Sequence, residues 1–127
     1  MLPAFPDVEA ALLDLLSTVA TTVVETGDPL SPPVIRINRV GGAVYGNLTD
    51  RPRVEIACYG SKRADARTLD EQVRQAMLAY YHGGTTPDGV LLDRVREDTS
   101  PTPIPYEAPD VRRVVSTYVV SLRRPRT

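Results

Sequence analysis

The feature that most constrains the fold is a strand pattern running directly into a helix pattern, in VEIACYGSKRADARTLDEQVRQAML, residues 54–78. Val54, Ile56 and Cys58 alternate onto one side of an extended chain, which is typical of a half-buried strand. After Gly60 and Ser61, apolar residues recur at helical spacing: Ala66, Leu69, Val73, Ala76, Met77 and Tyr80. A strand and a helix with one apolar side each can bury both sides by packing together. We therefore expect helices layered on a sheet.

The same two periodicities predict the other elements. Four apolar residues at spacings of 4, 3 and 4 predict an amphipathic helix near the start: Val8, Leu12, Leu15 and Val19. In order, the predicted elements are a helix at about 6–20, strands at 34–40 and 53–59, a helix at 61–81, and strands at 90–96 and 111–123. The sequence therefore predicts an α+β fold of order α-β-β-α-β-β. Its sheet is four-stranded and mainly antiparallel, with both helices packed on one face.

The segments between these elements are predicted as follows. The β-branched run 21–24 continues the first helix as a fraying end, and prolines make 27–33 a loop. Residues 41–52 form the long tip of the first hairpin. Residues 97–110 contain four prolines, which exclude a regular ladder along the whole segment, so 99–110 is predicted as a projecting loop.

Length and composition limit the class of protein. A chain of 127 residues with 42% hydrophobic content predicts a single domain over 1–127, with flexible ends at 1–5 and 124–127. A net charge of −1 and a pI near 5.8 argue against a dedicated nucleic-acid binder. Cys58 is alone, which excludes an intrachain disulfide and favours a reducing compartment. We expect a soluble protein, cytoplasmic when made.

Charge is distributed unevenly along the chain. Before Arg36 there are acidic residues and no Lys or Arg, whereas from Val111 onward there are arginines and no Asp or Glu. These could be ordinary solvated faces, or complementary patches through which copies meet head to tail, a contact that can close into a ring. The candidate subunit-interface residues are Asp7, Glu9, Asp14, Arg112, Arg113 and Arg123.

Arginine supplies every basic residue except Lys62. Its planar side chain favours paired contacts to carboxylates and phosphates. Charge in solvent and charge at an interface or facing DNA both explain this pattern. The candidate residues for loop contacts, or for lining a lumen, are Arg36, Arg39, Arg51, Arg53 and Tyr106.

No pattern in the sequence indicates catalysis. Cys58 falls on the apolar side of its strand, and His82 has no second metal ligand close in sequence. The neighbouring acid pairs, such as Glu97 and Asp98, cannot converge on one point as paired catalytic carboxylates must. Phosphate-binding glycine loops are also missing from the sequence. We predict that the protein is not an enzyme and that it has no cofactor or metal.

The order of these features resembles the tail terminator, or tail-completion, proteins of long-tailed phages, especially phages of actinobacteria. The similar motifs are an R-x-x-x-x-x-Y-G strand end at 53–60 and an A-x-x-L-x-x-x-V-x-x-A-M helix at 66–77. A GVLLDRVRED strand, a proline loop with PYEAPD and a terminal VRRVVSTYVVSLR strand follow. The resemblance covers about residues 5–124.

This resemblance implies a small α/β subunit that forms a ring, typically a hexamer, at the head-proximal end of the tail tube. Such a ring stops tube polymerisation and offers the surface on which the head docks. Genomic DNA passes through its lumen without sequence-specific binding. The implied partners are other copies, the tail tube protein and head-closure or connector proteins. The implied location is the tail-neck junction of the virion, after assembly in the host cytoplasm.

Two other interpretations remain open from the sequence. A head-closure or head-tail adaptor protein of the neck would have the same kind of partners, although the helix predicted at 61–81 counts against it. A small-ligand-binding regulatory module of ferredoxin-like type would need the order β-α-β-β-α-β. The predicted order instead begins with a helix.

Overall fold

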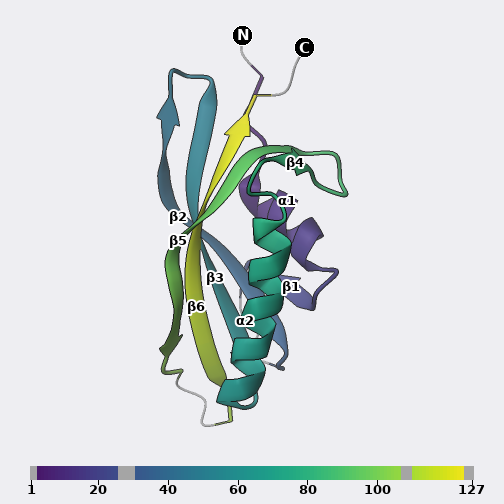
Figure 1. Cartoon of the computed structure of the whole chain (residues 1–127), viewed down its shortest axis with the longest axis vertical. Helices are drawn as coiled ribbons and strands as arrows, with labels where there is room; N and C mark the ends of the chain where they lie inside the picture. The colour runs from purple at the N-terminus through teal and green to yellow at the C-terminus, as the bar shows by residue number, and fades with distance from the viewer. Residues whose placement is uncertain (1–2, 26–30, 107–109, 125–127) are drawn as a thin grey trace.

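The computed structural model describes residues 3–25, 31–106 and 110–124, which form two helices and one six-stranded sheet (Figure 1). In chain order the elements are α1 (Val8–Leu16), β1 (Thr21–Val23), β2 (Val34–Tyr45), β3 (Thr49–Gly60), α2 (Arg63–Leu78), β4 (Gly84–Thr85), β5 (Leu91–Ile104) and β6 (Arg112–Arg123). Both helices lie against the same face of a curled sheet. We call the opposite side the open face.

The sheet has the order β1-β2-β3-β6-β5-β4. The four predicted strands form its antiparallel centre, and β1 and β4 are short additions at its two edges. β1 pairs in parallel with β2, Thr21 opposite Val34, so the prediction that 21–24 continues the first helix was wrong. β-branched side chains restrict the helical backbone and fit an extended one, which explains the change of structure here.

The predicted loop 41–52 is mostly strand. β2 and β3 remain paired as far as Tyr45 and Thr49, with a register shift between Arg39 and Gly42. Gly42 has a φ of +119°, and a Cβ atom there would lie 2.3 Å from the Arg51 carbonyl oxygen. Glycine therefore permits the two strands to approach closely at the bend, beyond which the hairpin projects past the helices (Figure 1). We call residues 40–49 the hairpin arm.

The second hairpin also extends further than predicted. β5 continues to Ile104, although it contains Pro101 and Pro103. Its ladder with β6 shifts register between Glu97 and Thr99 and again before Thr102, so it is irregular as proline requires. In the described part of the chain β4 pairs only with the start of β5, so the outer side of β5 is uncovered where the prolines lie. The predicted loop 99–110 is described up to residue 106 and again from 110.

The core lies between the helices and the sheet. α1 begins at Asp7, whose side chain accepts a hydrogen bond from the Glu9 N–H at 3.0 Å. The predicted core positions of the central strand and its helix are confirmed, because all of them are buried in this cluster: Val54, Ile56, Cys58, Leu69, Val73 and Met77. The two helices and β2, β3, β5 and β6 therefore share one apolar layer.

The two ends of the described chain meet at the same end of the molecule (Figure 1). The Arg124 guanidinium lies 4.0 Å from the centroid of the Phe5 ring and donates to the Pro3 carbonyl oxygen at 2.6 Å. Arg124 also donates to the Asn47 side chain at 2.9 Å, which connects this junction to the hairpin arm. The acidic first segment and the basic last strand thus approach each other within one chain.

Candidate assembly surfaces

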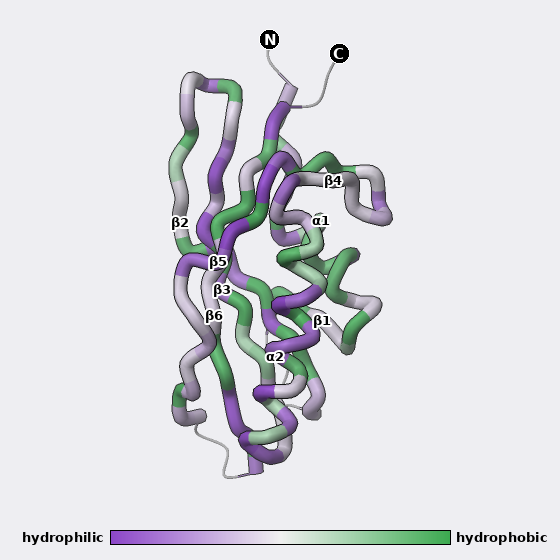
Figure 2. Tube along the Cα trace, viewed as in Figure 1, coloured by the Kyte–Doolittle hydropathy of each residue, from purple (hydrophilic) through white to green (hydrophobic). Residues whose placement is uncertain are grey.

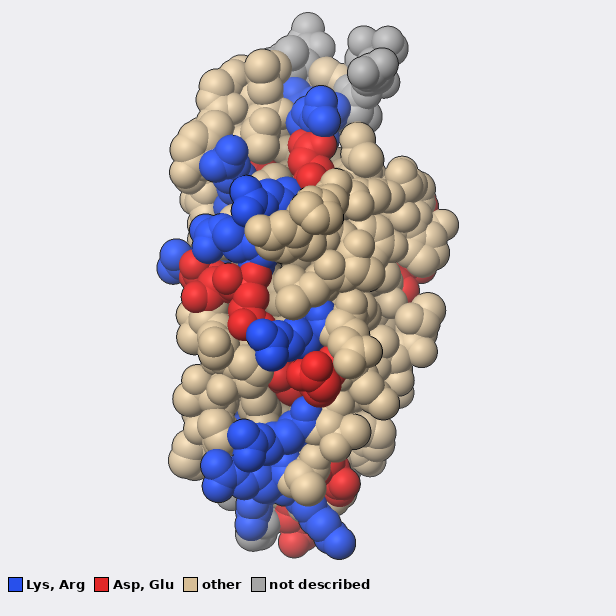
Figure 3. Space-filling view, in the orientation of Figure 1, with Lys and Arg blue, Asp and Glu red and all other residues tan. Residues whose placement is uncertain are grey.

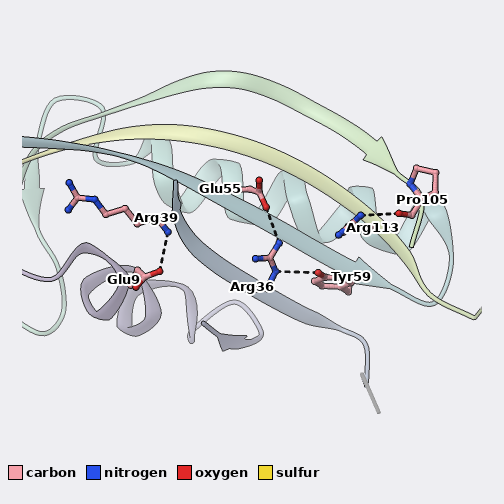
Figure 4. Close-up of polar contacts among 7 residues, drawn as sticks. All are labelled: Glu9, Arg36, Arg39, Glu55, Tyr59, Pro105 and Arg113. Carbon is pink, nitrogen blue, oxygen red and sulfur yellow. Dashed lines mark hydrogen bonds and ion pairs between the residues drawn. The ribbon is translucent and has the colours of Figure 1, made fainter. Parts of the chain in front are cut away.

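The acidic residues of α1 are partly used inside the chain. Asp7 caps the helix, and the Glu9 Oε2 atom accepts a hydrogen bond from the Arg39 backbone N–H at 3.0 Å (Figure 4). This bond ties α1 to the outer edge of β2 at a position that β1 does not reach. Asp7 is exposed, while Glu9 and Asp14 are half-buried. We call Asp7, Glu9 and Asp14 the acidic rim of α1. Two of these carboxylates, those of Asp7 and Glu9, already accept hydrogen bonds within the chain.

The predicted basic patch on the last strand is divided between the two ends of that strand. Arg112 and Arg113 begin β6 and Arg123 ends it, which at about 3.3 Å per residue separates them by roughly 35 Å. Arg113 donates to the Pro105 carbonyl oxygen at 2.9 Å (Figure 4). Arg123 makes hydrogen bonds of 2.7–2.9 Å to both Asp93 carboxylate oxygens. The three arginines cannot act as one surface.

A second group of basic residues gathers at the lower end of the molecule, near the start of α2 (Figure 3). Lys62, Arg63 and Arg67 are exposed there. Arg63 lines a cavity of about 340 Å³ together with Arg112 and Arg113. We call these five residues the basic end.

Tyr106 packs beside the cavity of the basic end. Its ring meets the Tyr59 ring edge-on, with centroids 5.2 Å apart, and the Arg113 guanidinium lies 5.4 Å from its centroid. Together with Val34, Ala57 and Val115, these rings form a small apolar cluster on the open face. Tyr106 therefore lies between the cavity of the basic end and the apolar cluster of the open face.

The arginines predicted for the first hairpin lie on different faces. Arg36 is on the open face, where it donates to Glu55 at 2.9 Å and to the Tyr59 hydroxyl at 3.3 Å (Figure 4). Arg39 is on the helix face and makes two hydrogen bonds of 2.8 and 2.9 Å to the buried Asp50 carboxylate. These bonds raise the pKa of Arg39. Arg39 is thus held inside its own chain and does not share a face of the sheet with Arg36.

Arg51 and Arg53 lie on the open face beside two arginines that the sequence did not single out, Arg94 and Arg96. Arg53 and Arg96 both pair with Asp98, at 3.2 and 3.3 Å. A cleft of about 90 Å³ is lined by Arg51, Arg94, Arg96, Val119 and Ser121. The alternation of Arg94, Val95 and Arg96 in β5 could have indicated these two arginines, because Val95 is buried on the helix face.

The hairpin arm contains no charged residue. Four of its large apolar side chains are exposed: Val40 (43%), Val44 (51%), Tyr45 (52%) and Leu48 (63%). Figure 2 shows the projecting hairpin as mostly pale or green, which marks neutral and hydrophobic residues. Within the described residues the strand on the outer side of β2 is β1, which ends opposite Arg36. The arm therefore combines exposed apolar side chains with an unpaired strand edge.

The titratable groups considered for chemistry occupy separate environments. Cys58 is fully buried, and burial followed by the charge of Asp70 raises the pKa of its thiol. His82 is exposed and packs edge-on against Tyr81, with ring centroids 4.8 Å apart. A search of the described residues finds no cluster of His, Cys, Asp and Glu that could hold a metal ion. None of the helices in the described ranges is long and apolar enough to cross a membrane.

Comparison with known proteins gives two positive results. A family model described as "Phage tail termination protein" matches residues 4–127. Among solved structures, a chain of the "Virion of native gene transfer agent (GTA) particle" superposes with a TM-score of 0.54 and 17% sequence identity. The match covers 90% of this chain and 85% of that one, and it shows a shared fold. No curated protein sequence matches the chain.

Proposed function

Because this chain belongs to the phage tail termination protein family, we propose that it forms a hexameric ring at the head-proximal end of the tail tube. The ring ends tube polymerisation and then provides the surface for head docking. Genomic DNA passes through its centre. In this role the protein is a structural component of the virion at the tail-neck junction, and the described residues contribute contact surfaces rather than reacting groups.

The observation that carries this proposal is the hairpin arm. Val44 and Leu48 are more than half exposed and are close along one turn that projects beyond the helices. Such uncharged, exposed apolar surface on a soluble domain marks a site of interaction with another chain. The free edge of β2 adds backbone donors and acceptors that a neighbouring strand can pair with. We assign the arm to contact with the adjacent ring of the tail.

Contacts between copies within the ring are assigned to charge. The acidic rim of α1 and the basic end are unlike surfaces of one chain, as a head-to-tail ring requires. Exposed Asp7 can approach Arg112 or Arg113 of the next copy, with Lys62 and Arg63 nearby. Because such exposed pairs individually contribute about 0–1 kcal/mol, they orient subunits on the tube end more than they stabilise a free ring.

The test is negative-stain imaging of the purified protein mixed with tail tubes of its own phage. We expect tube length to become fixed and a ring to cap one end, and capped tubes to bind filled heads. A protein that leaves tubes uncapped but binds portal-bearing heads would be a head-closure protein, which would overturn the proposal. Binding to neither would also overturn it. Finding the protein as a monomer in solution agrees with assembly that the tube end templates.

A further inference from the structure

The open face of the sheet carries an arginine-rich region halfway up the molecule (Figure 3). Arg96 and Arg53 both lie opposite Val119 of β6, on its two sides, and Arg94 lies opposite Ser121. Arg51 is two residues from Arg53 on β3 and therefore shares its face. Three adjacent strands thus bring four arginines to one face, and three of them, Arg51, Arg94 and Arg96, line the cleft of about 90 Å³.

The positive charge of this group is only partly compensated. Asp98 pairs with both Arg53 and Arg96 and does not line the cleft. Arg51 and Arg94 lie against aromatic rings, 4.3 Å from the Tyr45 centroid and 5.3 Å from the Tyr81 centroid. An aromatic ring orients a guanidinium without neutralising its charge. The three arginines that line the cleft are exposed, and Arg94 also donates to the Tyr81 hydroxyl at 3.4 Å.

We propose that this cleft binds the phosphodiester backbone of double-stranded DNA. The cleft is lined by three arginines, Ser121 and Val119. Its volume of about 90 Å³ suits one phosphate group. Guanidinium groups bind phosphate oxygens through paired hydrogen bonds. A stably bound protein partner would bury an apolar centre at the contact, whereas Val119 is the one apolar residue in the lining of the cleft. The exposed apolar residues of the arm are the part of the molecule that meets that requirement.

This inference rests on the proposed function, because it makes the open face the side that a DNA molecule in transit would meet. The whole chain has a net charge of −1, so attraction to DNA depends on local groups of basic residues such as this cleft. A single cleft per copy gives weak contact that depends on salt and not on base sequence. Such contact guides DNA without holding it, and a ring repeats it around the path.

The first experiment measures binding of a fluorescent DNA duplex of about 20 base pairs by anisotropy, at about 50 and 200 mM salt. The test variant is Arg51→Gln, Arg94→Gln and Arg96→Gln together. The matched control is Lys62→Gln, Arg63→Gln and Arg67→Gln together, which removes equal charge at the basic end. Thermal unfolding confirms that both variants fold.

We expect the cleft variant to lose affinity at least tenfold at the lower salt concentration. The slope of log K against log salt should become shallower by about 1, since the cleft holds one phosphate group and each lost phosphate contact contributes about 0.9. The control variant should keep most of the affinity and slope. Equal losses in both variants, or absence of wild-type binding at about 50 mM salt, would contradict a phosphate site in the cleft.

Competition with unlabelled molecules shows which kind of anion the cleft binds. Unlabelled duplex of unrelated sequence should displace the probe as well as the same sequence does, while inorganic phosphate at equal phosphate concentration should displace little. Strong displacement by inorganic phosphate alone would indicate a free-anion site. Poly-glutamate that competes as well as DNA would indicate an acidic protein partner. Either of these two results would overturn the assignment to DNA.

Tube capping separates this inference from the proposed function. The cleft variant should cap tail tubes as the wild type does, because it leaves every side chain of the hairpin arm and of the basic end unchanged. The completed particles should transfer DNA more slowly. Capping with unchanged DNA transfer would refute the cleft and leave the terminator role in place. A wild-type protein that does not cap tubes would refute the terminator role itself.

Discussion

The Ser116 hydroxyl donates a hydrogen bond to the Asp70 Oδ1 atom at 3.1 Å, in the layer between α2 and β6. Both residues are buried, and Asp70 is on the face of α2 that carries Leu69 and Val73. Burial raises the pKa of the Asp70 carboxyl, whereas the bond from Ser116 lowers it. The pKa of Asp70 is raised in total, so this buried site favours the protonated form of the carboxyl group.

Replacing Asp70 by Asn should make the protein more stable at pH 7. The amide oxygen keeps the acceptor for Ser116 while the charge is removed from the core. Asp70→Ala is the contrasting variant, and it should lower the free energy of unfolding by about 1–3 kcal/mol because the Ser116 hydroxyl loses its acceptor. Urea unfolding of both variants checks this. An Asn variant less stable than the wild type would show that the charge is compensated.

The stability difference between wild type and Asp70→Asn should also depend on pH. The pKa of Asp70 is higher in the folded protein than its ordinary value of 3.8, so protonation favours the fold. This contribution is fully present below the unfolded pKa and is lost as pH rises through the folded pKa. The advantage of the Asn variant should therefore shrink as pH falls from 7 toward about 4. A difference in the free energy of unfolding that stays constant with pH would contradict this prediction.

Cys58 should behave as an apolar core residue. Its thiol is fully buried and its pKa is raised, so a thiol reagent should label the protein only after unfolding in guanidinium. Cys58→Ser should cost about 1–3 kcal/mol by placing a hydroxyl in the core, with tube capping retained. Cys58→Ala serves as a control for the lost volume. Rapid labelling of the folded protein would restore a reactive role for this residue.

Arg39 should be more important for stability than its exposure suggests. Its side chain is 38% exposed, while that of its partner Asp50 is only 4% exposed. Arg39→Ala leaves a buried carboxylate unpaired and should reduce the free energy of unfolding by about 2–3 kcal/mol. Arg67→Ala, at an exposed position of α2, is the control and should change it by less than about 0.5 kcal/mol. Chemical denaturation of the two variants gives the comparison.

The elements with one covered side were predictable from the sequence. The alternation of Val54, Ile56 and Cys58 and the stripe of Leu69 and Val73 reflect burial against the helix layer, and the structure confirms both. Where neither side of a strand is covered, alternation carries no signal. The hairpin arm was therefore predicted as a loop, although its ladder continues to Tyr45 and Thr49.

The charged surfaces were less predictable, because their chemistry depends on pairing between distant segments. Arg123 was predicted for a subunit interface from the sequence alone, which gave no sign that its guanidinium pairs with Asp93 of the neighbouring strand. Arg94 and Arg96 form the cleft with Arg51 only because β3 and β5 flank β6. The strand order brings these groups together across more than forty residues of sequence. Residue type and spacing alone do not contain that order.

Reversing charge at the basic end should weaken assembly. With Arg112→Glu and Arg113→Glu together, we expect fewer capped tubes in images and a folded protein in circular dichroism. The control is Arg94→Glu with Arg96→Glu, which makes the same change in charge on the open face and should leave capping intact. Capping that survives reversal at Arg112 and Arg113 would remove both residues from the subunit interface.

The hairpin arm supports the most direct test of assembly, because its side chains can be changed with little effect on the fold. Val44 and Leu48 are 51% and 63% exposed, so Val44→Asp and Leu48→Asp together should alter the free energy of unfolding by less than about 1 kcal/mol. The same change places two charges on the proposed contact with the adjacent ring, where burying an unpaired carboxylate is strongly unfavourable. Tube capping should therefore be lost.

Leu91→Asp is a control for adding a carboxylate at an exposed apolar position, since Leu91 is 49% exposed at the start of β5 and lies outside the arm. It should unfold and cap tubes like the wild type. If the arm variant caps tubes normally, the arm is not the contact with the adjacent ring. If Leu91→Asp also abolishes capping, the effect comes from added charge in general. Loss in the arm variant alone identifies the arm as the element through which the ring recognises the tube.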